Sequence, residues 1–538
     1  MIDLAAAPVE AMPAAPGSIT TTIPLGDKPF TSPYFSIGQE ICQNLYVENA
    51  QSEYSKASYY LIKIPGLRRF GGLSSFNVGA CRGMLTTSVG AGRRTFSVNG
   101  SGVYELLADG TRVLLGNIGT TTGTVSLAEN GNLMMLVDGQ AGWILRFTDG
   151  NFTKITDGNF PGNDPTLGQL APTSVTYLDT YFIVNIPNSN QYYWSNGFYT
   201  WEDADATLHE YDPDVPDGYW SPLRSGQKIG KPDNISALVN CNNYLWLLGF
   251  NSCEIHYDSG DYNGQQFQRY QGAILNIGCQ APRSVAVYQN NIFFLGTDKD
   301  GTLGVFSNDG MNPIRISARG VEQVIQNMPV YSDCIAYCYA QNGHSFYVMQ
   351  FPAGNRTFVY DMVTQAWHER TKLIQGSGTY IRWDGQFATQ NFGKILIGDV
   401  STSEVYHLDP FYYQNDNPLS DGVNYIRCVK NTPIGFNLGK NIRYNWVQVI
   451  ANQGYGLTVD TAAGVGRDPT VQVAWANDTG IVYSNERPAP LGKQGEYSKR
   501  SIVLACGMGR NRVWRIAMTD PVPFVLVAIL VNGSPCRF

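Results

Sequence analysis

The sequence predicts an all-β protein that combines a β-propeller with a C-terminal β-sandwich. The chain of 538 residues has 57 glycines, 32 tyrosines and only 15% charged residues, a composition that suits short strands and tight turns better than helices. A three-stranded pattern recurs along its middle part. Beyond about Gly435 this pattern stops, and alternating strands with a turn signal every 10 to 25 residues or so follow, as in a β-sandwich.

The N-terminus reads "MIDLAAAPVEAMPAAPGSITTTIPLGDKP". It has no basic segment ahead of an apolar one, and proline interrupts it, so a secretion signal is not expected. We predict an extended, flexible Ala/Pro arm. With the segment that follows, this arm makes up residues 1–58 of the predicted domain organisation.

The repeating module is clearest in "SFYVMQFPAGNRTFVYDMVTQAWHERT", which runs from Ser345 to Thr371 and divides into three strands joined by two turns. Stacked radially, such meanders cover one another and leave only short edges exposed. Steps of roughly 40 to 60 residues match the length of propeller blades. Residues 59–435 are therefore predicted to form a propeller of six to eight blades, and seven copies can be counted. Their leading strands begin near Thr95, Leu133, Tyr181, Tyr244, Ile292, Phe346 and Ile395.

The turns carry the residues that a hairpin needs. Asn and Gly tolerate positive φ, so Asn-Gly and Asp-Gly pairs set strand register locally. The pairs are Asn99-Gly100, Asp109-Gly110, Asp138-Gly139, Asp149-Gly150, Asn196-Gly197 and Asp309-Gly310. Because a ring is stable only when its ends are tied, we expect a strand from "YYLIKIPG" (Tyr59–Gly66) to help close the propeller.

Two segments depart from the module. An acidic, proline-broken insertion is expected at about residues 201–233, from Trp201 to Asp233, and the sandwich at residues 436–538. The most apolar run, "PFVLVAILV" at Pro523–Val531, is far shorter than the roughly 20 residues of a membrane helix. It is predicted to be a buried strand of the sandwich.

The charged residues of the opening module invite a catalytic interpretation. Asp361 is predicted to lie at a turn and His368 on an edge strand, with Glu369 and Arg370 beside it. No other part of the sequence supplies a nucleophile or a partner for this histidine. We therefore predict no catalytic residue there, and the protein is not expected to be an enzyme.

Two acidic segments resemble metal-binding loops. "TDKDGT" (Thr297–Thr302) lacks the glutamate that an EF-hand places at its end, so a hairpin between blade strands is expected. "DPDVPDG", with Asp212, Asp214 and Asp217, is interpreted as a solvated acidic loop. The predicted sites therefore include no metal ligand and no cofactor-binding residue.

Net charge and cysteine content limit which functions the protein can have. The net charge of −7 offers no general attraction to nucleic acid. The basic pairs Arg68-Arg69 and Arg93-Arg94 are scattered, as are Arg510, Arg512 and Arg515, and we expect solvated faces or subunit salt bridges. Strand alternation predicts that the strand carrying Arg515 is half buried. Ten cysteines without a CxxC pair are expected to be buried, reduced thiols.

Distributed segments from about Asn44 onward resemble one known family. They include "YYLIKIPGLRRFGGL", "KPDNISALVNCNNYLWLLGFNSCEIHYDSG" and "YSKRSIVLACGMGRNRVWRIAMTDPV". The chain is similar to the packaged-DNA stabilisation proteins of short-tailed bacteriophages, also called tail-hub or nozzle proteins. The resemblance identifies no single functional residue.

The resemblance implies a structural subunit of the phage tail, made in the bacterial host cytoplasm and located in the virion. Such subunits form a ring, usually a hexamer, below the portal and its adaptor ring. The ring continues the DNA channel, a needle or plug closes its distal end, and tailspikes or fibres attach around it. Packaged DNA is expected to pass without tight binding. The alternative is a glycan-binding or glycan-cleaving propeller of a phage tail, and a cellular scaffold propeller is a further rival.

Overall fold

The computed structural model describes residues 18–26, 40–50, 57–72, 79–88, 92–202, 207–261, 265–420, 422–436, 439–458, 464–477 and 481–536. Among these residues α1 (Arg319–Gln326) is the one α-helix, beside short 3₁₀ turns, and the predicted all-β class is confirmed. No helix in this part of the chain has the length and apolar character needed to span a bilayer. The contacts divide the chain into two compact units, the described parts of residues 65–424 and those of 1–64 with 425–538.

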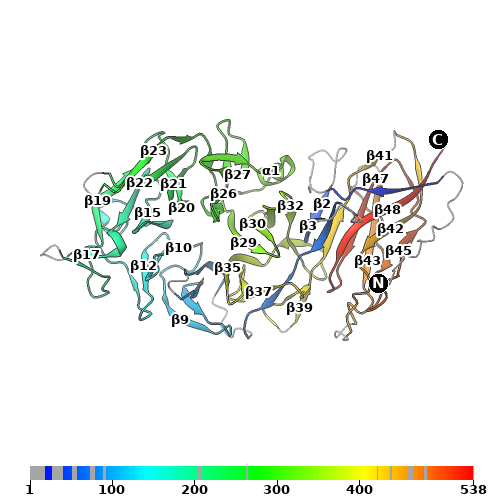
Figure 1. Cartoon of the computed structure of the whole chain (residues 1–538), viewed down its shortest axis with the longest axis horizontal. Helices are drawn as coiled ribbons and strands as arrows, with labels where there is room; N and C mark the ends of the chain where they lie inside the picture. Colours follow the sequence, from blue (N-terminus) through cyan, green and yellow to red (C-terminus); the bar gives the residue numbers. More distant parts are fainter. Residues whose placement is uncertain are drawn as a thin grey trace, which may run out of the picture. The chain divides into compact units, whose positions relative to one another are not determined.

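The unit of residues 65–424 is a β-propeller (Figure 1). Its seven antiparallel sheets follow one another along the chain. A separate hairpin interrupts the strand order of the third sheet, and a strand from the start of the unit completes the seventh. The first three blades comprise β6 (Cys81–Thr86), β7 (Thr95–Asn99), β8 (Gly102–Leu106) and β9 (Arg112–Asn117); β10 (Ser126–Glu129), β11 (Leu133–Val137), β12 (Gly142–Arg146) and β13 (Phe152–Lys154); and β14 (Val175–Leu178), β15 (Tyr181–Asn185), β16 (Gln191–Ser195) and β19 (Trp220–Gln227).

The later blades keep the same order. They comprise β20 (Ile235–Cys241), β21 (Tyr244–Gly249), β22 (Cys253–Asp258) and β23 (Phe267–Leu275); β24 (Gly278–Cys279), β25 (Ala286–Tyr288), β26 (Asn291–Thr297), β27 (Leu303–Asp309) and β28 (Asn312–Arg315); β29 (Ile335–Gln341), β30 (His344–Phe351), β31 (Arg356–Asp361) and β32 (Trp367–Glu369); and β35 (Gly385–Asn391), β36 (Lys394–Asp399), β37 (Val405–Asp409) and β5 (Gly66–Arg69). Short hairpins add β17 (Trp201–Glu202), β18 (Leu208–His209), β33 (Thr371–Leu373), β34 (Tyr380–Arg382), β38 (Gln414–Asp416) and β39 (Val423–Tyr425).

The seven predicted leading strands are all strands, but none is the first strand of its blade. Six are second along the chain, and β26 is third, after β24 and β25. The first strands, such as β10, β20, β29 and β35, lie nearest the centre of the propeller, where neighbouring first strands contact one another. The sequence pattern missed them because their residues are mixed in character, with fewer buried side chains than the second strands. Strand β10, for example, reads SLAE, and only one of its four side chains is fully buried.

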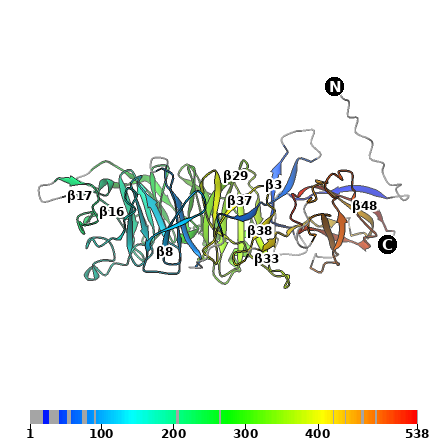
Figure 2. The ribbon, with the colours of Figure 1, turned by 90° about the horizontal axis from the view of Figure 1, so that it is seen from below.

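Five of the six predicted Asn-Gly and Asp-Gly turns have a glycine with positive φ, as in Gly110 at +87°. The prediction for Gly197 was wrong, because there Phe198 has the positive φ, of +54°, within a short 3₁₀ turn (Gly197–Tyr199). The chain does not return in a hairpin at this point. The outer strand of this blade, β19, comes later, so the acidic insertion expected at residues 201–233 in fact contains a blade strand. Figure 2 shows the β17–β18 hairpin projecting beside this blade.

The propeller core is distributed between neighbouring blades, not gathered at one centre. Buried clusters join successive sheets, such as Phe96 and Val98 of the first blade with Met134 and Leu136 of the second. The expected hairpin at "TDKDGT" is confirmed, since it joins β26 to β27. The Asp298 carboxylate there accepts backbone N–H groups of Asp300 and Thr302.

The ring is closed by β5, which pairs antiparallel with β37. A closing strand was predicted from Tyr59–Gly66, but only Gly66 of that segment belongs to it. The preceding strand, β4 (Tyr59–Lys63), pairs with β3 (Leu45–Asn49) and β48 (Val525–Pro535) in the other unit.

Apolar and ionic contacts support this closure. A cluster of Phe70, Leu106, Leu396 and Val405 joins the last blade to the first. The Glu404 carboxylate, which is 2% exposed, lies 3.8 Å from the Arg69 guanidinium and 3.6 Å from that of Arg112. Since Arg112 begins the outer strand of the first blade, the first and last blades share this carboxylate.

The other unit is a β-sandwich, as predicted. One sheet contains β1 (Ile19–Ile23), β3, β4, β42 (Ile442–Ala451), β45 (Ser501–Leu504), β46 (Met508–Gly509) and β48. Its second layer contains β2 (Ile41–Gln43), β40 (Cys428–Asn431), β41 (Gly435–Phe436), β43 (Thr470–Asn477), β44 (Arg487–Pro490) and β47 (Asn511–Met518). The rings of Tyr444 and Trp514 meet edge to face between the layers, with centroids 5.5 Å apart.

The boundaries of the two units differ from the predicted 58/59 and 435/436. The lead-in forms strands: β1 pairs with β48, β2 with β40, and β3 with β4. Residues 1–17, most of the predicted arm, lie outside the described residues. The run Pro523–Val531 does lie largely in a strand, β48, although its burial alternates along the strand. All ten cysteines are free thiols, and eight of them are buried.

Closure of the propeller predicts a clear stability effect for Leu67, which is 1% exposed and pairs with Leu408 across β5 and β37. Leu67→Ala should lower the free energy of unfolding of the propeller by about 2–5 kcal/mol, because it removes buried methyl groups and leaves a cavity. The measurement is urea unfolding followed by tryptophan fluorescence. Leu114→Ala on β9, where the leucine is 52% exposed, is the control and should change stability by less than about 0.5 kcal/mol. Equal effects of the two variants would contradict a closing role for β5.

Candidate functional site

The charged cluster of the sixth blade lies inside the sheet packing. Asp361 ends β31, as predicted. His368 lies on β32, the last strand of its blade, but the predicted edge position was wrong, because the sheet continues beyond β32. The exposed fractions of the two residues are only 1% and 3%. The Asp361 carboxylate accepts hydrogen bonds from the backbone N–H of Val363 and the hydroxyl of Thr364, at 3.0 and 2.7 Å. It therefore fixes the turn between β31 and β32.

Asp361 also has a partner that the sequence did not reveal. The Nδ1 atom of His344 lies 2.7 Å from its Oδ2 atom. His344 begins β30, just ahead of the module defined from Ser345, and the β30–β31 pairing brings it close. Strand pairing alone would have indicated this neighbour. The pair is buried, with His344 3% exposed, so it stabilises the blade from within.

His368 and Arg370 form a second buried pair. The Arg370 Nε–H group donates to Nε2 of His368 over 3.4 Å, so that nitrogen acts as an acceptor. The guanidinium also lies over the rings of Tyr339, Phe346 and Trp383, at 5.4, 5.2 and 4.9 Å from their centroids. Burial, then the Arg370 and His344 charges, lower the pKa of His368 well below its usual range. The histidine is therefore neutral in the folded protein.

Glu369 completes the cluster through an ion pair with Arg356, with Nε and Oε1 2.6 Å apart. Each charged group of the predicted cluster thus has a neighbour within its own blade. The arrangement holds strands and a turn together. A substrate would have to displace packed aromatic rings to reach His368.

The acidic insertion loop is held by backbone contacts. The Asp212 carboxylate accepts the N–H of Asp214, and that of Asp217 accepts the N–H of Gly158. In the part of the chain that the structure describes, no group of three or more His, Cys, Asp or Glu side chains is arranged to hold a metal ion.

The basic residues considered for phosphate contact are mostly engaged within the chain. Arg68 pairs with Asp409 at 3.1 Å, and Arg94 pairs with Glu105 through two nitrogens, each at 2.6 Å. Arg512 is fully buried, although solvated faces or subunit salt bridges were expected. Its guanidinium lies 4.1 Å from the Tyr444 ring centroid, between the sandwich layers.

The strand that carries Arg512, β47, is more buried than predicted. Six of its eight residues are buried, because it is an inner strand that pairs with β40 on one side and β43 on the other. Alternation indicated only one buried face. Cation–π contact with aromatic rings allows an arginine to occupy the second face.

Two family models match the chain. "Bacteriophage P22 Gp10, beta-propeller" matches residues 22–412, and "Bacteriophage P22 Gp10, beta-sandwich" matches residues 443–534. The first alone covers well over half of the chain. The chain belongs to this family of phage packaged-DNA stabilisation proteins.

Membership of the P22 Gp10 family confirms the resemblance predicted from the sequence. The chain is a phage structural protein of the tail and DNA-stabilisation kind, a component of the virion. A search of curated proteins finds no match.

Several solved structures share some likeness with the chain. The WD40 β-propeller domain of Doa1 has 8% identity and a TM-score of 0.36, over 64% of this chain and 97% of that one. The computationally designed Ika8 protein has 13% identity and a TM-score of 0.34, over 71% and 100%. The extracellular domain of the putative hybrid two-component system BT4673 from B. thetaiotaomicron has 10% identity and a TM-score of 0.37, over 73% and 44%. TM-scores this low do not indicate a role for the chain.

The neutral, buried His368 predicts a pH-dependent stability. Below the ordinary histidine pKa of 6.5 the unfolded chain takes up a proton that the folded blade does not accept. The contribution of His368 to the free energy of unfolding is thus present above pH 6.5. It is lost as the pH falls below that value, by up to about 1.4 kcal/mol per pH unit. His368→Gln, which cannot titrate, should lose less stability than the wild type between about pH 7.5 and pH 5.5 in urea unfolding. An identical pH dependence of both proteins would show that His368 is not held neutral.

Proposed function

We propose that this P22 Gp10 family member is a tail-hub, or nozzle, subunit that forms a ring below the portal–adaptor assembly of a short-tailed phage. The observation that carries the proposal is that the family models match both folded units, propeller and sandwich, in the order expected for the whole subunit. The ring extends the DNA channel. With a needle or plug it retains the packaged DNA until ejection.

A ring of identical subunits suits this architecture. Head-to-tail contacts between two different surfaces generate closed rings when the rotation between subunits closes. A propeller closed by β5 presents many loops on a rigid support. The charged residues of its sixth blade are buried and pack inside the blade. We therefore propose a hexamer without catalytic activity, whose partners are the adaptor ring, the needle or plug, and tailspikes or fibres. The free, mostly buried cysteines suit synthesis in the reducing host cytoplasm.

We also propose that DNA retention is steric. Tight duplex binding at physiological salt needs several Lys or Arg side chains that reach phosphate. Here Arg68, Arg94 and Arg512 already have partners within the chain, and the net charge is −7. The DNA then passes a wall that does not grip it, while the closed distal end prevents its exit.

The alternative is a glycan-binding or glycan-cleaving propeller. Glycoside hydrolysis ordinarily requires two carboxyl groups that flank the scissile bond. The cavity along the propeller axis has one carboxylate in its lining, that of Glu129, and it accepts the backbone N–H groups of Ser88 and Gly131. The axial cavity therefore lacks the pair of carboxyl groups that glycoside hydrolysis needs.

The oligomeric state is a direct test of ring formation. Mass photometry of the purified chain mixed with portal–adaptor rings should show complexes that gain the mass of a hexamer. A chain that stays monomeric beside those rings, yet binds a glycan array, would support the alternative function.

The steric account predicts weak DNA binding. In fluorescence anisotropy, a duplex of about 30 base pairs should bind weakly across roughly 50–200 mM salt, with a shallow log–log slope, since each phosphate contact contributes about −0.9. Nanomolar affinity with a slope steeper than about −5 would instead imply roughly six phosphate contacts and would contradict steric retention of the DNA.

A further inference from the structure

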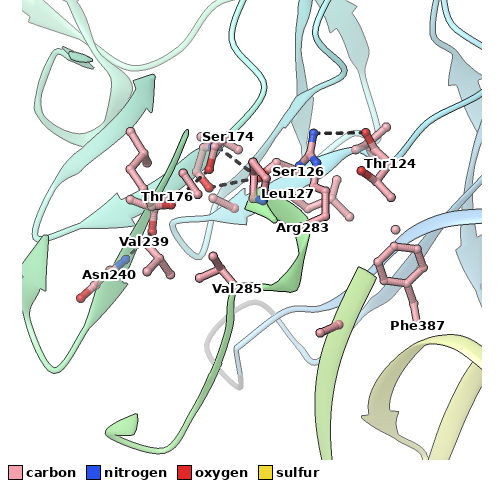
Figure 3. Close-up of a pocket in the computed structure, with 18 of the residues that line it drawn as sticks. Thr124, Ser126, Leu127, Ser174, Thr176, Val239, Asn240, Arg283, Val285 and Phe387 are labelled. Carbon is pink, nitrogen blue, oxygen red and sulfur yellow. Dashed lines mark hydrogen bonds between the residues drawn. The ribbon is translucent and has the colours of Figure 1, made fainter. Parts of the chain in front are cut away.

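A cavity of about 470 Å³ lies along the propeller axis. Its lining comes from the first strands of the blades and the 3₁₀ turn Pro282–Ser284, so every blade contributes. Figure 3 shows the Arg283 side chain reaching toward Thr124 beside Ser126, with Ser174 and Thr176 farther along the lining. Only Arg283 and Glu129 of the lining residues are charged.

The Arg283 guanidinium has few partners. One nitrogen donates to the Thr124 carbonyl oxygen over 3.4 Å, which is a long bond (Figure 3). Within the described residues no carboxylate lies in ion-pair distance of this side chain. A guanidinium has five N–H donors, and the others have no acceptor among the residues that the structure describes.

A second guanidinium adds positive charge nearby. Arg82 is 3% exposed and donates to the carbonyl oxygens of Gly100, Gly123, Thr120 and Thr122, and to the Thr120 hydroxyl. These neutral acceptors satisfy its hydrogen bonds but leave its charge in place. Burial, and then the Arg82 charge, lower the pKa of Arg283 to about 10, so both groups remain cationic at neutral pH.

The carboxylates near the cavity do not neutralise this pair by contact. Glu129 is occupied by backbone N–H groups, as described above. Asp138 accepts the Thr120 hydroxyl and the N–H groups of Gln140 and Ala141, and it acts on Arg82 only through space. A mobile anion can therefore neutralise the positive charge of Arg283 and Arg82.

The wall opposite supplies a further donor. The Thr176 hydroxyl oxygen accepts the backbone N–H of Asn240 at 3.0 Å, which leaves its own proton for another acceptor. The hydroxyls of Ser126 and Ser174 are already bonded to backbone carbonyls of Val175 and Leu238. Guanidinium and hydroxyl donors that line a cavity are the groups that bind tetrahedral oxyanions.

We propose that the axial cavity is a binding site for a small oxyanion, held by the Arg283 guanidinium and the Thr176 hydroxyl. Inorganic phosphate is the probe of choice, because its oxygens match the fork of a guanidinium. Such an anion ties the inner strands of several blades together. The site is independent of ring formation, so it goes beyond the proposed tail function.

Equilibrium dialysis of the full chain against labelled phosphate is the direct test. Saturable binding of about one phosphate per chain is expected at constant ionic strength, and Arg283→Gln should lose at least tenfold in affinity. Arg319→Gln removes an exposed arginine at the start of α1 and is the matched control, which should bind as the wild type does. Acetate is a second arm, since displacement of phosphate by acetate at equal concentration would show a carboxylate site instead.

A second measurement keeps the test valid if Arg283→Gln folds poorly. Crystals of the wild type soaked in selenate should show an anomalous peak beside Arg283. A ligand that binds only the folded state also raises the unfolding temperature, so phosphate should stabilise the wild type and Arg319→Gln alike. Absence of saturable phosphate binding, equal binding by Arg283→Gln, or a selenate peak elsewhere in the chain would overturn the proposal.

Discussion

The propeller depends on one pairing between distant parts of the chain, that of β5 with β37. Six blades form from strands that lie close together in the sequence, and each needs neighbours on both faces to bury its apolar side chains. Without β5, the last blade would lack its outer strand and the cluster around Phe70 and Leu106. The shared Glu404 carboxylate adds an ionic contact at the same place. Every later property, from rigid loops to the axial cavity, requires the closed ring.

Much of this fold could be predicted because the signals are local. Apolar second strands and Asn-Gly or Asp-Gly turns mark each blade, and the structure has strands at all seven predicted positions. The inner strands were missed, because segments of mixed character such as SLAE have no clear period. Tyr59–Gly66 is divided between two units because β4 pairs with β48 and β5 pairs with β37. Both partner strands lie more than 300 residues later in the sequence. No local pattern contains that information.

For the charged groups, too, the sequence predicted positions but not surroundings. The turn position of Asp361 and the strand position of His368 followed from the module, but their burial did not. The partner His344 and the aromatic rings over Arg370 come from neighbouring strands. Arg283 was not singled out at all, since nothing in "APRSV" distinguishes it from a surface arginine. Only the closure of the ring around the axis gives that residue a special environment.

A cryo-electron microscopy map of the virion tail would show whether this P22 Gp10 family member is a ring subunit of the tail. Density for the propeller and the sandwich is expected in a symmetric ring immediately below the adaptor, around a channel continuous with that of the portal. Density for the chain only in peripheral fibres or spikes, or a tail whose ring is built from another protein, would contradict it.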